Sequence, residues 1–160
     1  MSSAVIVSVR VKASPARAFD VFTQEIALWW RPNPLFQLTP WGDGVLRFES
    51  GEGGRLLAAL ADGREFEVGR VGAWIRGERL AFSWGPVTFS QGQTTQVSVG
   101  FEAMGEETRV TVEHRGWSEI SPDHASRHGF PLGQFQLRLG EHWRALLDSL
   151  AEAAPRLSSN

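Results

Sequence analysis

The sequence predicts a single α+β domain in which a curved antiparallel sheet of about seven strands wraps around a long C-terminal helix. Three observations indicate this fold. Valines alternate near the N-terminus, short alternating segments between glycine turns fill the middle of the chain, and one apolar stripe at helical spacing runs near the C-terminus. Such a sheet buries a single apolar helix best when it twists and folds over it. Two short helices are expected after the first strand.

The length and composition are those of one ordinary globular domain. The chain has 160 residues, 42% of them hydrophobic and 21% charged, so we expect one domain over residues 1–160 with an ordered part of about 4–154. A net charge of -2 gives no basic field for nucleic acid. No stretch approaches the length of a membrane span and no signal segment opens the chain, which predicts a cytoplasmic protein without membrane insertion.

The N-terminal part reads as one strand followed by a helical pair. Valine alternates with mostly polar residues over 4–12, which is typical of a half-buried strand. Ser14 and Pro15 then form a helix start, with a capping side chain followed by a proline at the first helical position. Apolar residues recur at helical spacing up to Trp29 and Trp30. The prolines that follow end the second helix.

The rest of the chain alternates between strands and turns until the last helix. We expect strands over 45–49, 55–60, 65–75, 80–84, 94–103 and 108–114, a short helical segment over 121–129, and a final helix over 134–153. Pro155 is expected to begin a frayed tail. The buried stripe of the final helix comprises Phe135, Leu139, Trp143, Leu146, Leu147 and Leu150.

Several segments together resemble a known family. They are 14–19 after the valine strand, the tryptophan pair at 29–30, the glycines 53–54, and the stretches 69–71, 78–84, 108–114 and 143–150. In this order they resemble the START-like superfamily with its helix-grip fold. Within that superfamily they resemble the group related to the C-terminal domain of the Hsp90 ATPase activator. The resemblance implies a cavity protein, because many relatives bind lipids, hormones or polyketides.

The inward-facing aromatic residues are the candidate lining of that cavity. Strand alternation and helical spacing direct most of them to the space between the sheet and the final helix. The alternative is that they fill this space completely as an ordinary core. The candidate ligand-binding residues are Phe22, Trp29, Trp30, Phe36, Phe48, Trp74, Phe82, Trp84, Phe101, His114, Trp143 and Leu147.

Polar chemistry has weaker support in the sequence. Alternation after Val110 and Val112 directs His114 inward, where its imidazole could bond a ligand or a structural partner. His124 and His128 have the spacing of a metal pair, but this spacing is weak evidence, a short polar surface helix explains both histidines, and no metal or cofactor is assigned. No nucleophile or acid pair stands out, so no catalytic residue is assigned.

Three functions remain open at this point. The first is a binding protein for an apolar small molecule in the interior cavity. The second is a cyclase- or hydrolase-like enzyme in the same cavity, which would need His114 or Arg47 to face the ligand. The third is a chaperone-accessory module with a protein partner, which predicts an exposed apolar patch around Leu35, Phe36 and Trp41. A homodimer is compatible with each of them.

Overall fold

The structure, a computed structural model of the chain, describes residues 4–31, 44–84, 95–116 and 132–157. Over these residues the predicted order of elements is confirmed. In chain order they are β1 (Val5–Val11), α1 (Pro15–Gln24), α2 (Ile26–Trp29), β2 (Val45–Phe48), β3 (Arg55–Ala59), β4 (Glu65–Ile75), β5 (Arg79–Trp84), β6 (Thr95–Met104), β7 (Glu107–Arg115) and α3 (Leu132–Leu157).

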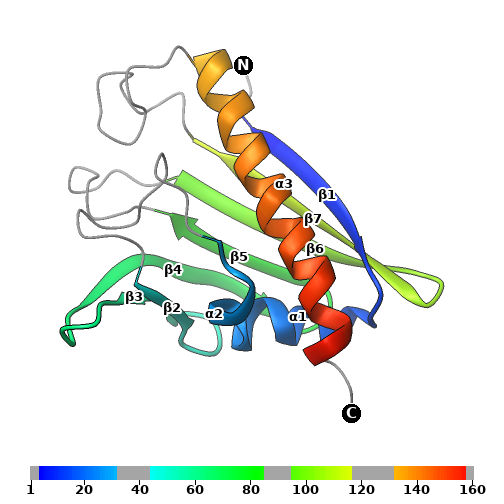
Figure 1. Cartoon of the computed structure of the whole chain (residues 1–160), viewed down its shortest axis with the longest axis horizontal. Coiled ribbons are helices and arrows are strands. Elements are labelled where there is room, and N and C mark those ends of the chain that lie inside the picture. Colours follow the sequence, from blue (N-terminus) through cyan, green and yellow to red (C-terminus); the bar gives the residue numbers. More distant parts are fainter. Residues whose placement is uncertain (1–3, 32–43, 85–94, 117–131, 158–160) are drawn as a thin grey trace.

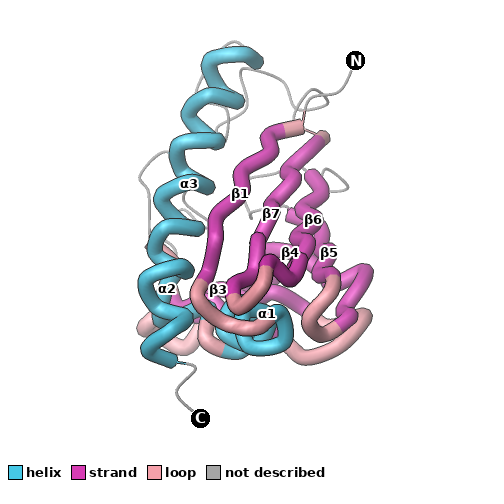
Figure 2. Tube along the Cα trace, turned by 90° about the vertical axis from the view of Figure 1, so that its right-hand side faces the viewer, coloured by secondary structure: helices cyan, strands magenta, loops and turns pink. Residues whose placement is uncertain are grey.

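The seven strands form one antiparallel sheet around a long helix, as the sequence predicts. The strand order is β1-β7-β6-β5-β4-β3-β2, so the first strand joins the end of the meander beside the last strand. Figure 1 shows α3 lying across the sheet, with α1 and α2 at one end of it. In the perpendicular view of Figure 2, α3 covers one face of the sheet, and no described helix covers the other face.

Alternation along the strands separates the core from the surface. In β1, Val5, Val7 and Val11 are buried, and Val7 lies opposite Val112 of β7. The other face of the same pair is polar, because the hydroxyl oxygens of Ser8 and Thr111 lie 2.9 Å apart there. The covered face of the sheet is therefore the one that carries the core.

The helical pair begins as the sequence predicts. Ser14 caps α1, since its hydroxyl accepts a bond from the Arg17 backbone N–H at 3.2 Å, and Pro15 occupies the first turn. Phe19 and Phe22 are buried on one side of the helix. The second helix is a single turn that ends at Trp29. It serves chiefly to position Trp29 and Trp30 at its end.

Bulges bend the sheet near β4. The register shifts between Leu56 and Leu57 of β3 and again between Val71 and Ala73 of β4. At Gly69 the neighbouring strand comes so close that an added Cβ would overlap the carbonyl oxygen of Ser83. Bulges and a close backbone approach increase the local twist and curvature of a sheet. This bend allows the sheet to curl toward α3.

Both ends of the last helix need correction. It spans Leu132–Leu157 instead of the expected 134–153, so it begins two residues earlier and continues through Pro155 instead of ending before it. Ala154 is fully buried, so the packed face of the helix extends to its last turn and stabilises it, although the proline lacks one backbone donor. The predicted helical segment 121–129, the proposed patch residues 35, 36 and 41, and the histidine pair at 124 and 128 lie outside the described residues. Among the described helices, none is long and apolar enough to cross a membrane.

Candidate ligand site between the sheet and the long helix

The long helix approaches the sheet mainly along one edge. Its backbone lies nearest to β1, while the middle strands of the sheet are farther from it. The intervening space is occupied by large side chains, of which Trp29, Trp143, Phe19 and Phe22 are almost fully buried. The inner face of the sheet and α3 are therefore joined mainly by large apolar side chains.

One row of aromatic rings follows the sheet. Phe48 of β2 contacts Trp74 of β4 at 6.4 Å between ring centroids and Phe82 of β5 at 5.3 Å. Phe82 in turn lies 6.4 Å from Trp84. These residues alternate inward on short strands, so the row follows from the strand register.

A second row joins the helical pair to the sheet. Phe101 of β6 contacts Phe19 at 5.2 Å and Phe22 at 6.0 Å. Phe22 contacts Trp29 at 4.9 Å, and Trp29 contacts Trp30 at 5.9 Å. The rings cross mostly at steep angles, an arrangement that aromatic side chains prefer.

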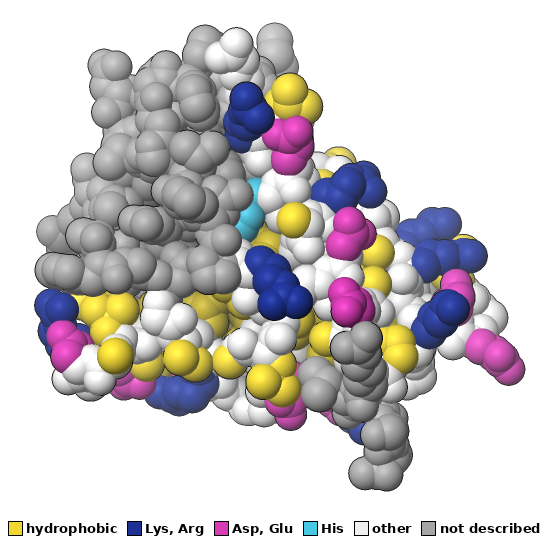
Figure 3. Space-filling view, in the orientation of Figure 1, with side chains coloured by type: hydrophobic (Ala, Val, Ile, Leu, Met, Phe, Trp, Pro, Cys, Tyr) yellow, Lys and Arg dark blue, Asp and Glu magenta, His cyan; other side chains and the backbone are white. Residues whose placement is uncertain are grey.

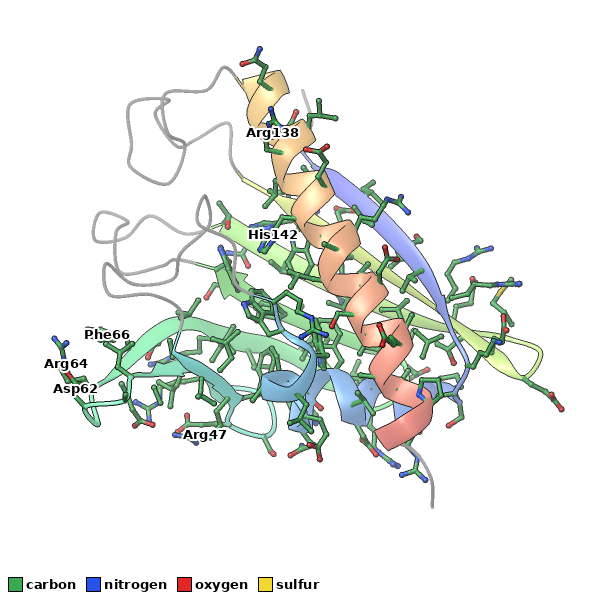
Figure 4. The ribbon with its side chains drawn as sticks, viewed as in Figure 1. Arg47, Asp62, Arg64, Phe66, Arg138 and His142 are labelled. Atoms are coloured by element: carbon green, nitrogen blue, oxygen red, sulfur yellow. The ribbon has the colours of Figure 1, made fainter. Side chains whose placement is uncertain are left out.

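The two rows meet at four rings that we call the tryptophan cluster, which consists of Trp30, Trp84, Trp143 and His142. Trp30 lies 5.7 Å from Trp84 at 35°, and 6.0 Å from both Trp143 and His142 at close to 90°. Trp84 and Trp143 are 6.5 Å apart. Figure 4 shows His142 projecting from α3 over the sheet. The cluster therefore draws on α3, β5 and the end of α2.

A chain of hydrogen bonds fixes one side of the cluster. The Trp143 indole N–H donates to His114 Nδ1 at 3.1 Å. An indole nitrogen can only donate, so Nδ1 accepts and the proton of the neutral ring lies on Nε2. That nitrogen donates to Thr95 Oγ1 at 2.7 Å, and Thr95 donates to the carbonyl of Trp84 at 3.0 Å. His114 thereby connects α3, β6 and β5.

Both histidines at this site are neutral at physiological pH. Burial, and to a lesser extent the nearby His142, lowers the pKa of His114 to about 3. Burial also lowers the pKa of His142 to about 4. Both nitrogens of His114 are occupied by protein partners, so its role in this structure is to hold its neighbours in place.

The structure locates the candidate residues that the sequence suggests. His114 is 1% exposed, as strand alternation indicates, while Trp30 and Trp74 are only partly buried. Phe36 lies outside the described residues. The remaining candidates, all buried, are Phe22, Trp29, Phe48, Phe82, Trp84, Phe101, Trp143 and Leu147.

Two members of the site were missed by sequence reasoning. His142 is buried beside Trp143, and its spacing of three residues from Leu139 could have placed it on the apolar stripe. Thr95 shares strand parity with Val97 and could have been placed inward in the same way. A polar residue on an apolar face carries no local signal for its partner, so the sequence alone does not single out either residue.

The charged candidates lie elsewhere. Arg47 is exposed and pairs with Glu65 at 3.0 Å, and Figure 4 shows it directed away from α3. It does not face the interior, so of the two side chains named for the enzyme alternative only His114 does. Glu49 bonds Arg55 at the surface, which lowers the pKa of that carboxyl to about 2. The described part of the chain contains no group of three or more metal-ligating side chains.

The surface near the cluster is partly apolar. Figure 3 shows a histidine side chain at the border of the region that is not described, and hydrophobic side chains gathered along the lower part of the same face. The exposed large hydrophobic residues include Leu28 of α2 and Val45 of β2, which belong to neighbouring elements.

The family assignment agrees with this architecture. The model for the family described as Activator of Hsp90 ATPase homolog 1-like protein matches residues 12–154. This chain belongs to that family. The match spans the helical pair, the meander and most of α3, so the family and the fold cover the same part of the chain. No curated protein sequence matches the chain.

Solved structures of similar fold come from several bacteria. A protein from Nitrosomonas europaea has a TM-score of 0.64 at 14% identity, covering 98% of this chain and 97% of its own. The Aha1 dimer from Colwellia psychrerythraea has a TM-score of 0.61 at 17% identity, covering 94% and 95%. DynU16, a protein in the dynemicin biosynthetic locus, has a TM-score of 0.63 at 21% identity, covering 94% of this chain and 46% of its own. These likenesses show the fold.

Proposed function

We propose that this protein binds a hydrophobic or aromatic small molecule between the inner face of the sheet and α3. The observation that supports this most is the tryptophan cluster. Its rings come from three separate elements and surround one partly buried indole, so its aromatic surface is not sealed within the core. Ligand sites are typically apolar and aromatic, and here the bonds of His114 to Trp143 and to Thr95 hold part of the aromatic lining in place.

The charges of the described residues favour a neutral ligand. Every described lysine and arginine side chain is exposed except Arg17, which is half-buried. Both histidines at the cluster are held neutral by burial, with lowered pKa values. A carboxylate or phosphate buried without a cation would carry a large desolvation cost. A neutral aromatic molecule is therefore the class that this lining suits.

Native mass spectrometry and a thermal-shift screen together test the proposal. The mass of protein purified without organic solvent is measured in native and denatured states. A panel of ligands is then screened by the change in melting temperature. The panel includes the neutral dye N-phenyl-1-naphthylamine and its sulfonated analogue 8-anilinonaphthalene-1-sulfonate, which differ in one charged group. We expect a bound adduct, or a higher melting temperature with the neutral dye than with the anionic one. A native mass equal to the chain mass, with no shift for any member of the panel, would remove the proposal.

A homodimer is the second part of the proposal. The similar Colwellia protein is a dimer, and Leu28 and Val45 are exposed by 56% and 58% on neighbouring elements of this chain. Apolar side chains at that exposure are suited to a contact between copies. Light scattering after size exclusion should give about twice the chain mass of 17.7 kDa. A monomer at all concentrations tested would contradict this part without affecting ligand binding.

A further inference from the structure

The outward side of α2 exposes a large apolar residue. Ile26 and Trp29 of this short helix are buried, whereas Leu28 is 56% exposed. The Leu28 backbone N–H donates to the carbonyl of Glu25 at 2.9 Å, so these two exposed residues are one turn apart and lie on the same side. Val45 of β2, the strand beside α2, is 58% exposed and adds a second apolar side chain. This apolar surface belongs to no core contact of the chain.

Two opposite charges flank Leu28 at equal spacing along the sequence. Glu25 lies three residues before it, and Arg31 lies three residues after it, just past the end of α2; both are exposed. Within the described part of the chain, neither side chain forms an ion pair. The charges beside Val45 differ in this respect, because Arg47 already pairs with Glu65 at 3.0 Å. The charges of Glu25 and Arg31 are therefore available to a partner outside the chain.

The order of these charges indicates the kind of partner that fits. A complementary surface must present an apolar contact with a positive charge on one side and a negative charge on the other, in the reverse order. A two-fold axis makes residue i of one copy meet residue j of the other, and residue j meet residue i. A second copy of this chain, turned about an axis at Leu28, has its charges in the required order.

We infer that a second copy docks on the outward side of α2, with the two Leu28 side chains in contact at a two-fold axis and Glu25 of each copy opposite Arg31 of the other. The inference rests on the homodimer part of the proposed function, and it specifies the surface and the orientation of the two copies. The Glu25–Arg31 pair forms twice in such a dimer, once on each side of the axis. Val45 borders the contact in both copies.

The test uses the charge-reversal variants Glu25→Arg and Arg31→Glu, each alone and then mixed. Either variant alone places like charges opposite each other in both pairs. Each exposed pair changes an equilibrium by roughly fivefold or less, and two attractions become two repulsions, so we expect the dimer dissociation constant to rise about tenfold. In an equimolar mixture, one variant supplies both positive charges and the other both negative charges. We expect a heterodimer whose dissociation constant lies within about threefold of the native value.

Sedimentation velocity measures the dissociation constants, and native mass spectrometry identifies the heterodimer, because the two variants differ in mass. Glu106→Arg is the matched control. It makes the same substitution at another exposed carboxylate, in the turn between β6 and β7, which Figure 1 shows apart from α2. This control should dimerise like the native chain, and it should not restore the dimer when mixed with Arg31→Glu.

The outcomes distinguish this inference from the homodimer itself. A native dimer whose dissociation constant is unchanged in both variants, or is raised in both without recovery in the mixture, would overturn the contact at α2 and leave the homodimer standing. A native chain that stays monomeric would remove both. If Glu25→Arg does not fold, as judged by circular dichroism, Arg31→Glu decides through its response to salt. Screening should strengthen the dimer of that variant and weaken the native dimer, and a change of the same sign in both would overturn the inference.

Discussion

His114 illustrates how one polar residue is accommodated inside an aromatic layer. It is 1% exposed, and its two ring nitrogens are both bonded, one to Trp143 and one to Thr95. An imidazole bonded in this way needs to be neutral, because the nitrogen that accepts the indole N–H would carry a proton in the charged form and could no longer accept. The depressed pKa of His114 is thus a property of the fold, and it makes the stability of the protein sensitive to acid.

We predict that the free energy of unfolding falls as the pH drops below about 6.5. The unfolded chain binds protons at its histidines from that pH downward, while the folded chain resists protonation until about 4 at His142 and about 3 at His114. The unfolded state therefore binds more protons in this window, and stability decreases with falling pH. Between pH 7.5 and 5.5 the loss should be about 1.4 kcal/mol for each of the two histidines.

Urea unfolding at the two pH values measures this effect. His142→Gln removes one titrating group and should reduce the loss by about half. Glu49→Gln is the control, because the pKa of Glu49 lies at about 2, outside the window. An equal loss in His142→Gln and the native chain would show that burial of this histidine does not produce the acid sensitivity.

At the scale of the elements, the bend of the sheet depends on a close contact between β4 and β5. Gly69 packs against the backbone of Ser83, whose hydroxyl accepts a bond from the Arg70 N–H at 2.9 Å. Only a residue without a Cβ fits there. Gly72, three positions later on the same strand, has nothing within 4 Å of an added Cβ. Substitution of the two glycines therefore compares a crowded site with an uncrowded site on the same strand.

Gly69→Ala should destabilise the protein by at least about 2 kcal/mol, because the added methyl group forces the two strands apart. Gly72→Ala should change the free energy of unfolding by less than about 0.5 kcal/mol, as expected for an uncrowded site. Urea denaturation of both variants measures the difference. Similar stabilities for the two would mean that the strands tolerate a wider separation at Gly69 and that this contact does not set the bend.

The whole architecture could be read from the sequence to a large extent. Valine alternation, the Ser14 cap and the glycine turns are local signals, so strand bounds agree within one or two residues and the helical pair was expected. The end of α3 was misjudged because proline is a local signal for a helix end, whereas the packing of Ala154 comes from distant residues.

The internal arrangement of the site could not be predicted in the same way. Strand parity directs His114 inward, but it does not say that Trp143, 29 residues later, donates to it. Likewise, two adjacent tryptophans cannot both face the core on a helix, yet only the structure shows that Trp29 is the fully buried one and Trp30 the partly buried one. Pairings of this kind depend on how α3 crosses the sheet, which local patterns do not encode.

The most direct test of ligand binding at the tryptophan cluster is a titration followed by the indole N–H signals in a nitrogen-15 correlation spectrum. The chain has seven tryptophans, and each signal can be assigned with a Trp→Phe variant. On addition of N-phenyl-1-naphthylamine, the signals of Trp30, Trp84 and Trp143 should shift strongly, while that of Trp74, at the far end of the aromatic row, should move little. Unchanged cluster signals, or a shift confined to Trp74, would contradict a ligand site at this cluster.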